Sequence, residues 1–211
     1  MNDQGDAAAA ELLSVANELA DVARRATLQH FRTSSLGIET KSDRRFDPVT
    51  EADRAAEEAM RAVLARRRPD DGILGEEFPP VEGRSGLTWV LDPVDGTRAF
   101  LAGTPTWGVL IGLRTADRVC LGVIDQPFIG ERFTGGLGEA RVSGPQGEMP
   151  LVARPARPLS EAILFSTFPE VGTEAEGRAF HRLSARTRLT RYGLDCYAYA
   201  LLALGQIDLV V

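Results

Sequence analysis

The sequence predicts an α+β protein, and three features of its patterning support this prediction. Apolar residues recur every three or four positions before residue 70, as on the buried face of an amphipathic helix. Short runs of β-prone residues separated by turn residues follow. After about residue 160, strand-like and helix-like runs alternate, which is typical of βαβ units.

Two helices are expected first. Residues 9–31 place apolar side chains along one face: Leu12, Ala16, Leu19, Ala20, Ala23 and Phe31. A second helix is predicted from Thr50-Glu51-Ala52-Asp53 onward, and Pro69 and Gly72 end it. Both helices carry a polar face as well, so we expect each to pack on one side only.

The middle of the chain predicts a mostly antiparallel sheet. Its strands are expected at 87–91, 107–113 and 119–124. Glycines then become frequent, which indicates hairpin tips or a looser connection: Gly135, Gly136, Gly138, Gly144 and Gly147. We place the boundary between two halves there, with an N-terminal α+β half over 1–140 and a C-terminal α/β half over 141–211.

The C-terminal half is expected to alternate strand and helix. The predicted order is strand 161–166, helix 175–185, strand 188–191, helix 195–204 and a strand that begins at Ile207. The last residues, Leu209-Val210-Val211, are apolar and would leave a strand edge exposed. We therefore expect this half to be incomplete and the natural protein to be longer.

Composition excludes several classes of function. With 24 Lys and Arg against 30 Asp and Glu, the net charge is −6, which does not suit a nucleic-acid partner. The sequence also lacks an apolar run long enough for a membrane span and a signal-like N-terminus, so we expect a cytoplasmic location. Cys120 and Cys196 are expected to be reduced and buried, and His30 and His181 to be structural or surface residues.

The segment Asp92-Pro93-Val94-Asp95-Gly96-Thr97 is the most informative in the chain. An apolar run delivers two carboxylates into a tight turn, where both could bind cations while the Gly96 and Thr97 amides receive phosphate oxygens. Dense oxygen ligands suit Mg²⁺. The alternative is that Asp-Pro and Asp-Gly are turn residues only.

Two further acidic segments have similar double interpretations. Gly75-Glu76-Glu77 sets two carboxylates after a short apolar run, where a cation or simple surface exposure would relieve their repulsion. Thr50 and Asp53 have the spacing of a capping box, and a helix N-terminus also suits a catalytic group.

Taken together and in this order, the three segments resemble the inositol monophosphatase family, whose motifs they match as VTEAD, GEE and DPVDGT. Segments 122–127, 130–132 and 193–200 resemble its histidinol-phosphatase-like branch. The resemblance covers nearly all of residues 10–211. It implies a layered αβαβα sandwich, two or three Mg²⁺ ions per site, a small phosphorylated substrate and a homodimer.

The resemblance also implies roles for individual residues. Glu76 and Asp92 would bind a first Mg²⁺ with the carbonyl of Val94, and Asp92 and Asp95 would bind a second. Thr97, hydrogen-bonded to Asp53, would activate the attacking water, and the amides of Gly96 and Thr97 would bind phosphate. Lys41 is similar to a lysine upstream of the first family motif, although its spacing is loose.

Substrate and completeness are less strongly determined. Histidinol phosphate is the leading substrate, and Asp195 would meet its cationic part, although Asp195 could instead be a helix N-cap. The alternative is an inositol phosphate or another sugar phosphate. Tyr197 and Tyr199 are expected to face the core. Family members continue to a further metal-binding aspartate beyond the strand at Ile207, so a phosphate-binding module with impaired catalysis is the alternative of another class.

Overall fold

The computed structural model describes residues 3–33, 38–40, 48–170 and 172–211. Its long helices α1 (Asp3–His30) and α2 (Glu51–Arg67) come first, flanking a hairpin of β1 (Ile38–Thr40) and β2 (Pro48–Thr50). The two helices predicted before residue 70 are therefore confirmed, although α1 begins earlier than expected. Helix α2 ends at Arg67, two residues before Pro69, because proline cannot continue a helix.

A seven-stranded sheet forms the centre of the first half. Its strands lie in chain order: β3 (Gly72–Leu74), β4 (Thr88–Asp95), β5 (Gly108–Arg114), β6 (Val119–Gln126), β7 (Glu131–Gly136), β8 (Glu139–Gly144) and β9 (Gly147–Pro150). Strands β3 and β4 pair in parallel and every later pair is antiparallel. The predicted antiparallel sheet is confirmed, and the short helix α3 (Thr97–Leu101) interrupts it after β4.

The glycine-rich stretch belongs to this sheet rather than to a connection between halves. Gly136 ends β7 and Gly138 lies in the turn to β8, and Gly144 and Gly147 flank the next turn, so these glycines mark hairpin tips. The sheet continues to Pro150, ten residues beyond the expected boundary at 140. Residues 151–158 then run without regular structure to a short 3₁₀ helix, Leu159–Glu161.

The second half is a three-stranded parallel sheet with two helices. Strand β10 (Ile163–Ser166) lies in the middle, between β11 (Leu189–Tyr192) and β12 (Leu209–Val210). Helix α4 (Glu174–Ser184) connects β10 to β11, and helix α5 (Asp195–Ala203) connects β11 to β12. The expected βαβ alternation is confirmed.

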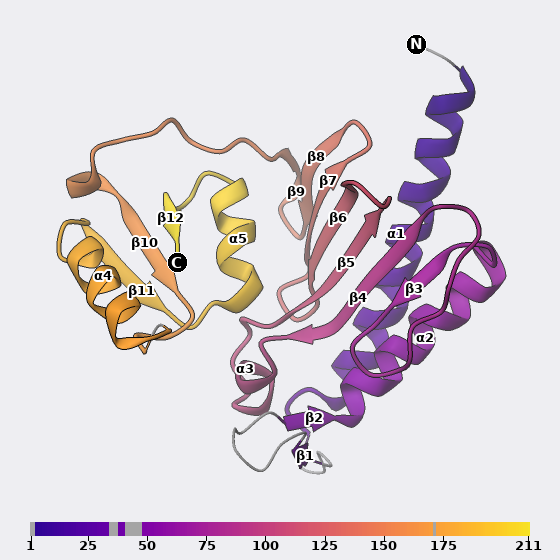
Figure 1. Cartoon of the computed structure of the whole chain (residues 1–211), viewed down its shortest axis with the longest axis horizontal. Helices are drawn as coiled ribbons and strands as arrows, with labels where there is room; N and C mark the ends of the chain where they lie inside the picture. The colour runs from indigo at the N-terminus through magenta and orange to yellow at the C-terminus, as the bar shows by residue number, and fades with distance from the viewer. Residues whose placement is uncertain (1–2, 34–37, 41–47, 171) are drawn as a thin grey trace.

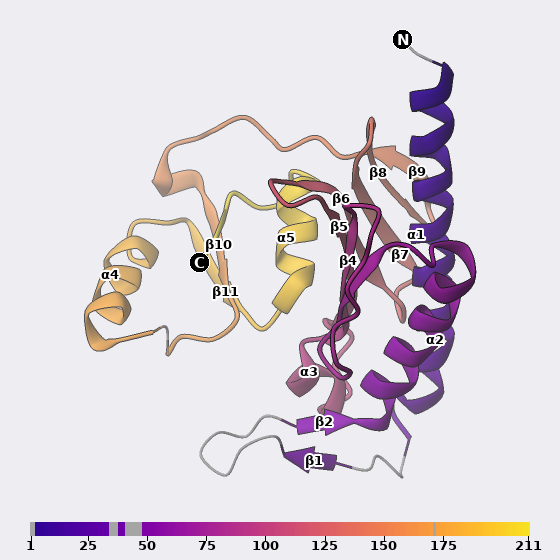
Figure 2. The same ribbon diagram turned by 45° about the vertical axis from the view of Figure 1, so that its right-hand side comes forward.

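The layers follow the order helix, sheet, helix, sheet, helix (Figure 1, Figure 2). Helices α1 and α2 cover one face of the seven-stranded sheet, α5 lies between the two sheets, and α4 lies outside the second. The αβαβα sandwich implied by the sequence resemblance is therefore the observed fold.

Packing explains why each helix takes its layer. The apolar stripe of α1 and the inner face of α2 bury against β4, β5 and β6 in one cluster, which includes Leu19, Met60, Trp89 and Ile111. Helix α5 is apolar on more than one side, as a helix covered on both faces must be. Its Ala200 packs on the first sheet, whereas its Ala198 packs on the second.

A buried ionic cluster joins α1 to the sheet. The carboxylate of Asp125 on β6 has no exposed surface and accepts hydrogen bonds from Arg24 at 3.0 and 2.7 Å and from Arg132 at 2.7 Å. The guanidinium groups of Arg24 and Arg132 both contact this carboxylate, so its buried negative charge is paired with positive charges.

Some expectations about single side chains were wrong. Tyr199 is 56% exposed rather than core-facing, and Cys120 is half-buried near the start of β6. Tyr197 does face the core, where its ring meets that of Phe133 edge to face at 6.0 Å. Both cysteines are free. No helix in the described part of the chain is long and apolar enough to cross a membrane.

Candidate active site

A bulge in β4 sets the geometry of the candidate site. In a regular strand, residues three apart point to opposite faces of the sheet. Asp92 pairs with Leu110 and Asp95 pairs with Gly108, so two residues of β4 face one residue of β5 between these pairs. The extra residue lies at Pro93-Val94, both buried, and it brings Asp92 and Asp95 to the same face. The carboxylates therefore lie on the side of the sheet that faces α5.

The turn after β4 requires a glycine for two reasons. Gly96 has φ 87°, in the left-handed region, and it is the N-cap of α3. A Cβ atom at this position would also lie 2.8 Å from Oδ2 of Asp195. Asp195 therefore lies directly over the turn that carries the two strand carboxylates.

The carboxyl group of Asp92 has a strongly raised pKa. Burial, together with the negative charges of Glu76, Asp95 and Asp53, raises its pKa to about 8, against the lowering effect of the hydrogen bond from the Val94 amide. The structure thus brings together four acids from three separate sequence motifs. Among the described residues, buried Oδ1 of Asp92 has no hydrogen-bond partner.

Helix α2 and the loop after β3 supply the other two acids. Asp53 lies in the first turn of α2 and is 3% exposed. Glu76 follows β3 in an exposed loop. The buried carboxylate of Glu57, one helical turn after Asp53, accepts the backbone amides of that loop. The sequence analysis did not single out Glu57, because the amides that it accepts lie in a loop 19 and 20 residues further along the chain.

Thr97 begins α3 beside the strand carboxylates. Its hydroxyl lies 3.2 Å from the carbonyl oxygen of Val94, to which it donates. The carbonyl expected to bind a cation and the hydroxyl expected to act on water are thus neighbours. The hydrogen bond between Thr97 and Asp53 stays a prediction.

Asp195 enters the site from the second half of the chain. It is the first residue of α5, with φ 45°, and the N-cap is Leu194, so the N-cap alternative for Asp195 is wrong. Burial and the charge of Asp95 raise its pKa to about 6, against the lowering effect of Arg98. The next amide, of Cys196, donates to Oδ2 of Asp95 at 2.7 Å. Asp95 therefore satisfies an amide in the first turn of α5, as the side chain of an N-cap residue commonly does.

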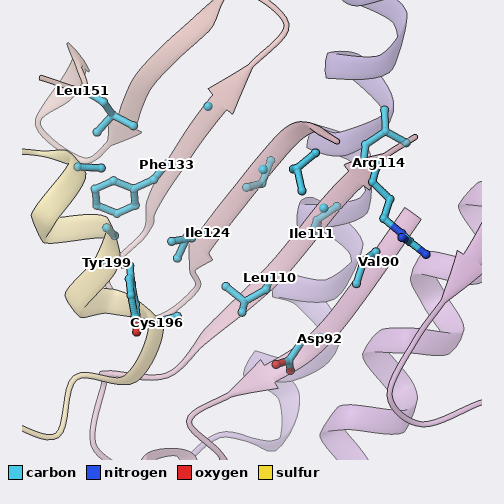
Figure 3. Close-up of a pocket in the computed structure, with 18 residues that line it drawn as sticks. Val90, Asp92, Leu110, Ile111, Arg114, Ile124, Phe133, Leu151, Cys196 and Tyr199 are labelled. Atoms are coloured by element: carbon cyan, nitrogen blue, oxygen red, sulfur yellow. The ribbon is translucent and has the colours of Figure 1, made fainter. Parts of the chain in front are cut away.

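A cavity of about 590 Å³ adjoins this group of acids (Figure 3). Its walls are the inner faces of β4, β5 and β6 on one side and Cys196 and Tyr199 of α5 on the other. Apart from Asp92 and Arg114, the lining is largely apolar, with Ile124 and Phe133 among its members. The two charged residues of the lining lie apart, with Asp92 beside the acids and Arg114 at the far end of β5.

Two expectations fall outside what the structure describes. Lys41 lies in the segment 41–47, and the side chain of Thr50 is not among those described. His30 is half-buried at the end of α1 and His181 is exposed on α4, as expected for structural or surface residues.

The types of donor atom fit a hard divalent cation. Asp92 offers an unpartnered buried oxygen, Asp95 and the Val94 carbonyl add oxygen donors at the same turn, and Glu76 adds its carboxylate from the loop after β3. Within the described residues, no group of three or more acidic, histidine or cysteine side chains is arranged to hold a metal ion by itself. The carbonyl of Val94 and water would therefore have to complete the ligand set.

Comparisons with known proteins agree on one family. The model of the inositol monophosphatase family matches residues 8–211. The bifunctional phosphatase IMPL2 of Arabidopsis thaliana is 38% identical over 94% of this chain and 56% of its own length. The histidinol-phosphatase of Chlorobaculum parvum is 34% identical over 94% of this chain and 75% of its own. The chain thus spans between about half and three quarters of these curated relatives.

A solved structure agrees with these sequence matches. An inositol monophosphatase from Zymomonas mobilis has a TM-score of 0.78 and 41% identity, over 94% of this chain and 74% of its own. The layered fold described above is therefore shared with an inositol monophosphatase.

The raised pKa of Asp92 predicts how pH affects stability without metal. The folded chain holds this proton up to about pH 8, whereas the ordinary pKa of an aspartic acid side chain is 3.8. Between these values the folded state binds more protons than the unfolded state, so the free energy of unfolding falls as pH rises. Urea unfolding in the presence of a chelator measures this slope. Asp92→Asn flattens it and Asp117→Asn, at an exposed position, does not; equal slopes in wild type and Asp92→Asn would contradict the assignment.

Proposed function

Because the chain belongs to the inositol monophosphatase family, we propose that it contributes the active site of a Mg²⁺-dependent phosphomonoesterase. The observation that carries this proposal is the convergence of Glu76, Asp95 and Asp53 on the half-buried Asp92. Three negative charges around the carboxyl group of Asp92 are unfavourable unless a cation or a proton on that group offsets them. Clusters with this property are found at functional sites more often than in purely structural positions.

The strand carboxylates and the neighbouring loop would hold the metal. Glu76, Asp92 and the carbonyl of Val94 form one set of ligands, and Asp92 with Asp95 forms a second. Mg²⁺ bound there lowers the pKa of water and offsets the negative charge that develops on the departing oxygen. The number of ions per site, two or three, is part of the proposal.

The turn residues would act on the water and the phosphate. Thr97 and Asp53 take a proton from the attacking water, and the amides of Gly96 and Thr97 bind phosphate oxygens. A bond forms between the water oxygen and phosphorus while the ester bond breaks. The departing alkoxide takes up a proton, so the products are inorganic phosphate and an alcohol.

For the substrate we propose histidinol phosphate, with an inositol phosphate or another sugar phosphate as the alternative. Asp195 supports the first choice, since a carboxylate with a pKa of about 6 is mostly ionised at pH 7 and would pair with a cationic amine. It lies over Gly96, at the turn where phosphate would bind. Relatives named as histidinol-phosphatases match over 93% or 94% of this chain.

Removing the central ligand tests the activity. Asp92→Asn keeps the size of the side chain but loses its charge, so Mg²⁺-dependent phosphate release falls by on the order of 100-fold or more. Release of phosphate from histidinol phosphate measures this. Asp117→Asn, on an exposed turn, keeps wild-type activity. Unaltered release in Asp92→Asn would refute the site, and binding of phosphate without any turnover in wild type would favour the module with impaired catalysis.

Asp195→Asn tests the substrate. Loss of one charge-assisted contact lowers kcat/KM for histidinol phosphate by about tenfold. Parallel assays on inositol phosphate, which carries no amine, show a much smaller change. A higher rate of the wild-type chain on inositol phosphate, or equal losses on both substrates, would overturn the choice of histidinol phosphate.

A further inference from the structure

Glu57 is a fully buried carboxylate to which the proposed mechanism gives no role. Its residue has no exposed surface, and it lies on α2 one helical turn after Asp53. A buried charge is costly unless hydrogen bonds and an opposite charge compensate it. The groups that compensate Glu57 all lie on, or also contact, the loop that carries Glu76.

Three consecutive backbone amides of this loop converge on the Glu57 carboxylate. Oε2 accepts from the amide of Glu76 at 2.9 Å and from that of Glu77 at 2.7 Å. Oε1 accepts from the amide of Phe78 at 3.3 Å and from Nε of Arg61 at 2.8 Å. Successive amides pointing at one anion form a concave site, here filled by a side chain of the same protein.

The glycine of the Gly-Glu-Glu motif is explained by this contact. A Cβ atom on Gly75 would lie 1.9 Å from Oε1 of Glu57, closer than any side chain can approach. Residue 75 must therefore be glycine for the carboxylate to reach the three amides.

Other side chains of α2 hold the same loop. Arg61 also donates to the carbonyl of Phe78 at 3.0 Å. Nε of Arg54 lies 3.8 Å from a carboxylate oxygen of Glu77, whose side chain is 4% exposed. The adjacent acids thus separate, with Glu77 directed toward α2 and Glu76 exposed near Asp92.

We infer that Glu57 is a positioning residue for the metal site, which fixes the backbone of Glu76 so that its carboxylate is preorganised beside Asp92. The inference rests on the proposed function, because it takes Glu76 as a metal ligand. An exposed loop without this anchor would have to be ordered when the cation binds, and that entropy cost weakens binding. Supporting residues of this kind change metal affinity although they do not touch the metal.

Glu57→Gln tests the inference with little change of shape. Each oxygen of the Glu57 carboxylate accepts hydrogen bonds from two N–H groups. Whichever way the glutamine amide turns, its NH₂ group replaces one of these oxygens and cannot accept from the two N–H groups that it faces. The dissociation constant for Mn²⁺, used as a probe for Mg²⁺ and measured by electron paramagnetic resonance, is expected to rise about 10- to 100-fold. Phosphate release at saturating Mg²⁺ falls much less than in Asp92→Asn.

Asp125→Asn is the matched control for general loss of stability. It also replaces a fully buried, arginine-paired carboxylate with an amide, but its partners lie on α1 and β7 rather than on the loop of Glu76. Its Mn²⁺ affinity is expected to equal that of wild type even where its unfolding midpoint drops.

Gly75→Ala is a second test of the inference, because it displaces the Glu57 carboxylate without removing it. It is expected to weaken Mn²⁺ binding as Glu57→Gln does, and it replaces Glu57→Gln as the test if Glu57→Gln does not fold.

The outcomes separate this inference from the proposed function. Wild-type affinity in both Glu57→Gln and Gly75→Ala, with weak binding in Glu76→Gln, would overturn the role of Glu57 and leave the metal site standing. Equal weakening in Asp125→Asn would also overturn it, because the effect would then follow stability. Unchanged Mn²⁺ binding in Glu76→Gln would overturn the proposed ligand and the inference together.

Discussion

Repulsion among carboxylates is the constraint on which the first half of the molecule depends. Burial and the charges of Glu76, Asp95 and Asp53 hold the pKa of Asp92 near 8, so the fold keeps the acids together against their electrostatic preference. Each acid is fixed by a different part of the scaffold. Asp92 is bound by the amide of Val94, Asp95 accepts the amide of Cys196, and the loop of Glu76 is anchored on Glu57. A cation of high charge density is the ligand that such an arrangement favours.

The same turn couples the two halves of the chain. Helix α5 begins against β4, where Asp95 accepts its second amide and Asp195 covers Gly96. A Cβ atom on Gly108 would lie 2.7 Å from the sulfur of Cys196, so β5 also needs a glycine where α5 approaches. Groups proposed to bind phosphate and the group proposed to select the substrate thus lie on different layers of the sandwich. Specificity could change through α5 without altering the metal ligands.

Much of this arrangement could be predicted from the sequence. Helical periodicity located α1 and α2, because it follows from which helix face is buried, and short β-prone runs between turn residues located β4, β5 and β6. The bulge at Pro93-Val94 could not be predicted from periodicity, since it depends on pairing with β5. Glu57 was missed for a similar reason: its partners lie about 20 residues further along the chain.

Errors and untested predictions have the same physical origin. Tyr199 was expected to face the core, yet it is more than half exposed and lines the cavity. Its exposure depends on what packs against α5, which a local pattern does not contain. The homodimer, the number of ions and the cytoplasmic location depend on partners and surroundings outside the chain, and they stay predictions.

The central claim is that Asp92 and its neighbouring acids form a divalent metal site. Anomalous diffraction from crystals soaked in saturating Mn²⁺ tests it most directly, because it locates the ion among named ligands. We expect a peak bounded by Glu76, Asp92, Asp95 and the carbonyl of Val94, which disappears in Asp92→Asn. Mn²⁺ bound elsewhere, with no peak at these residues, would contradict the account.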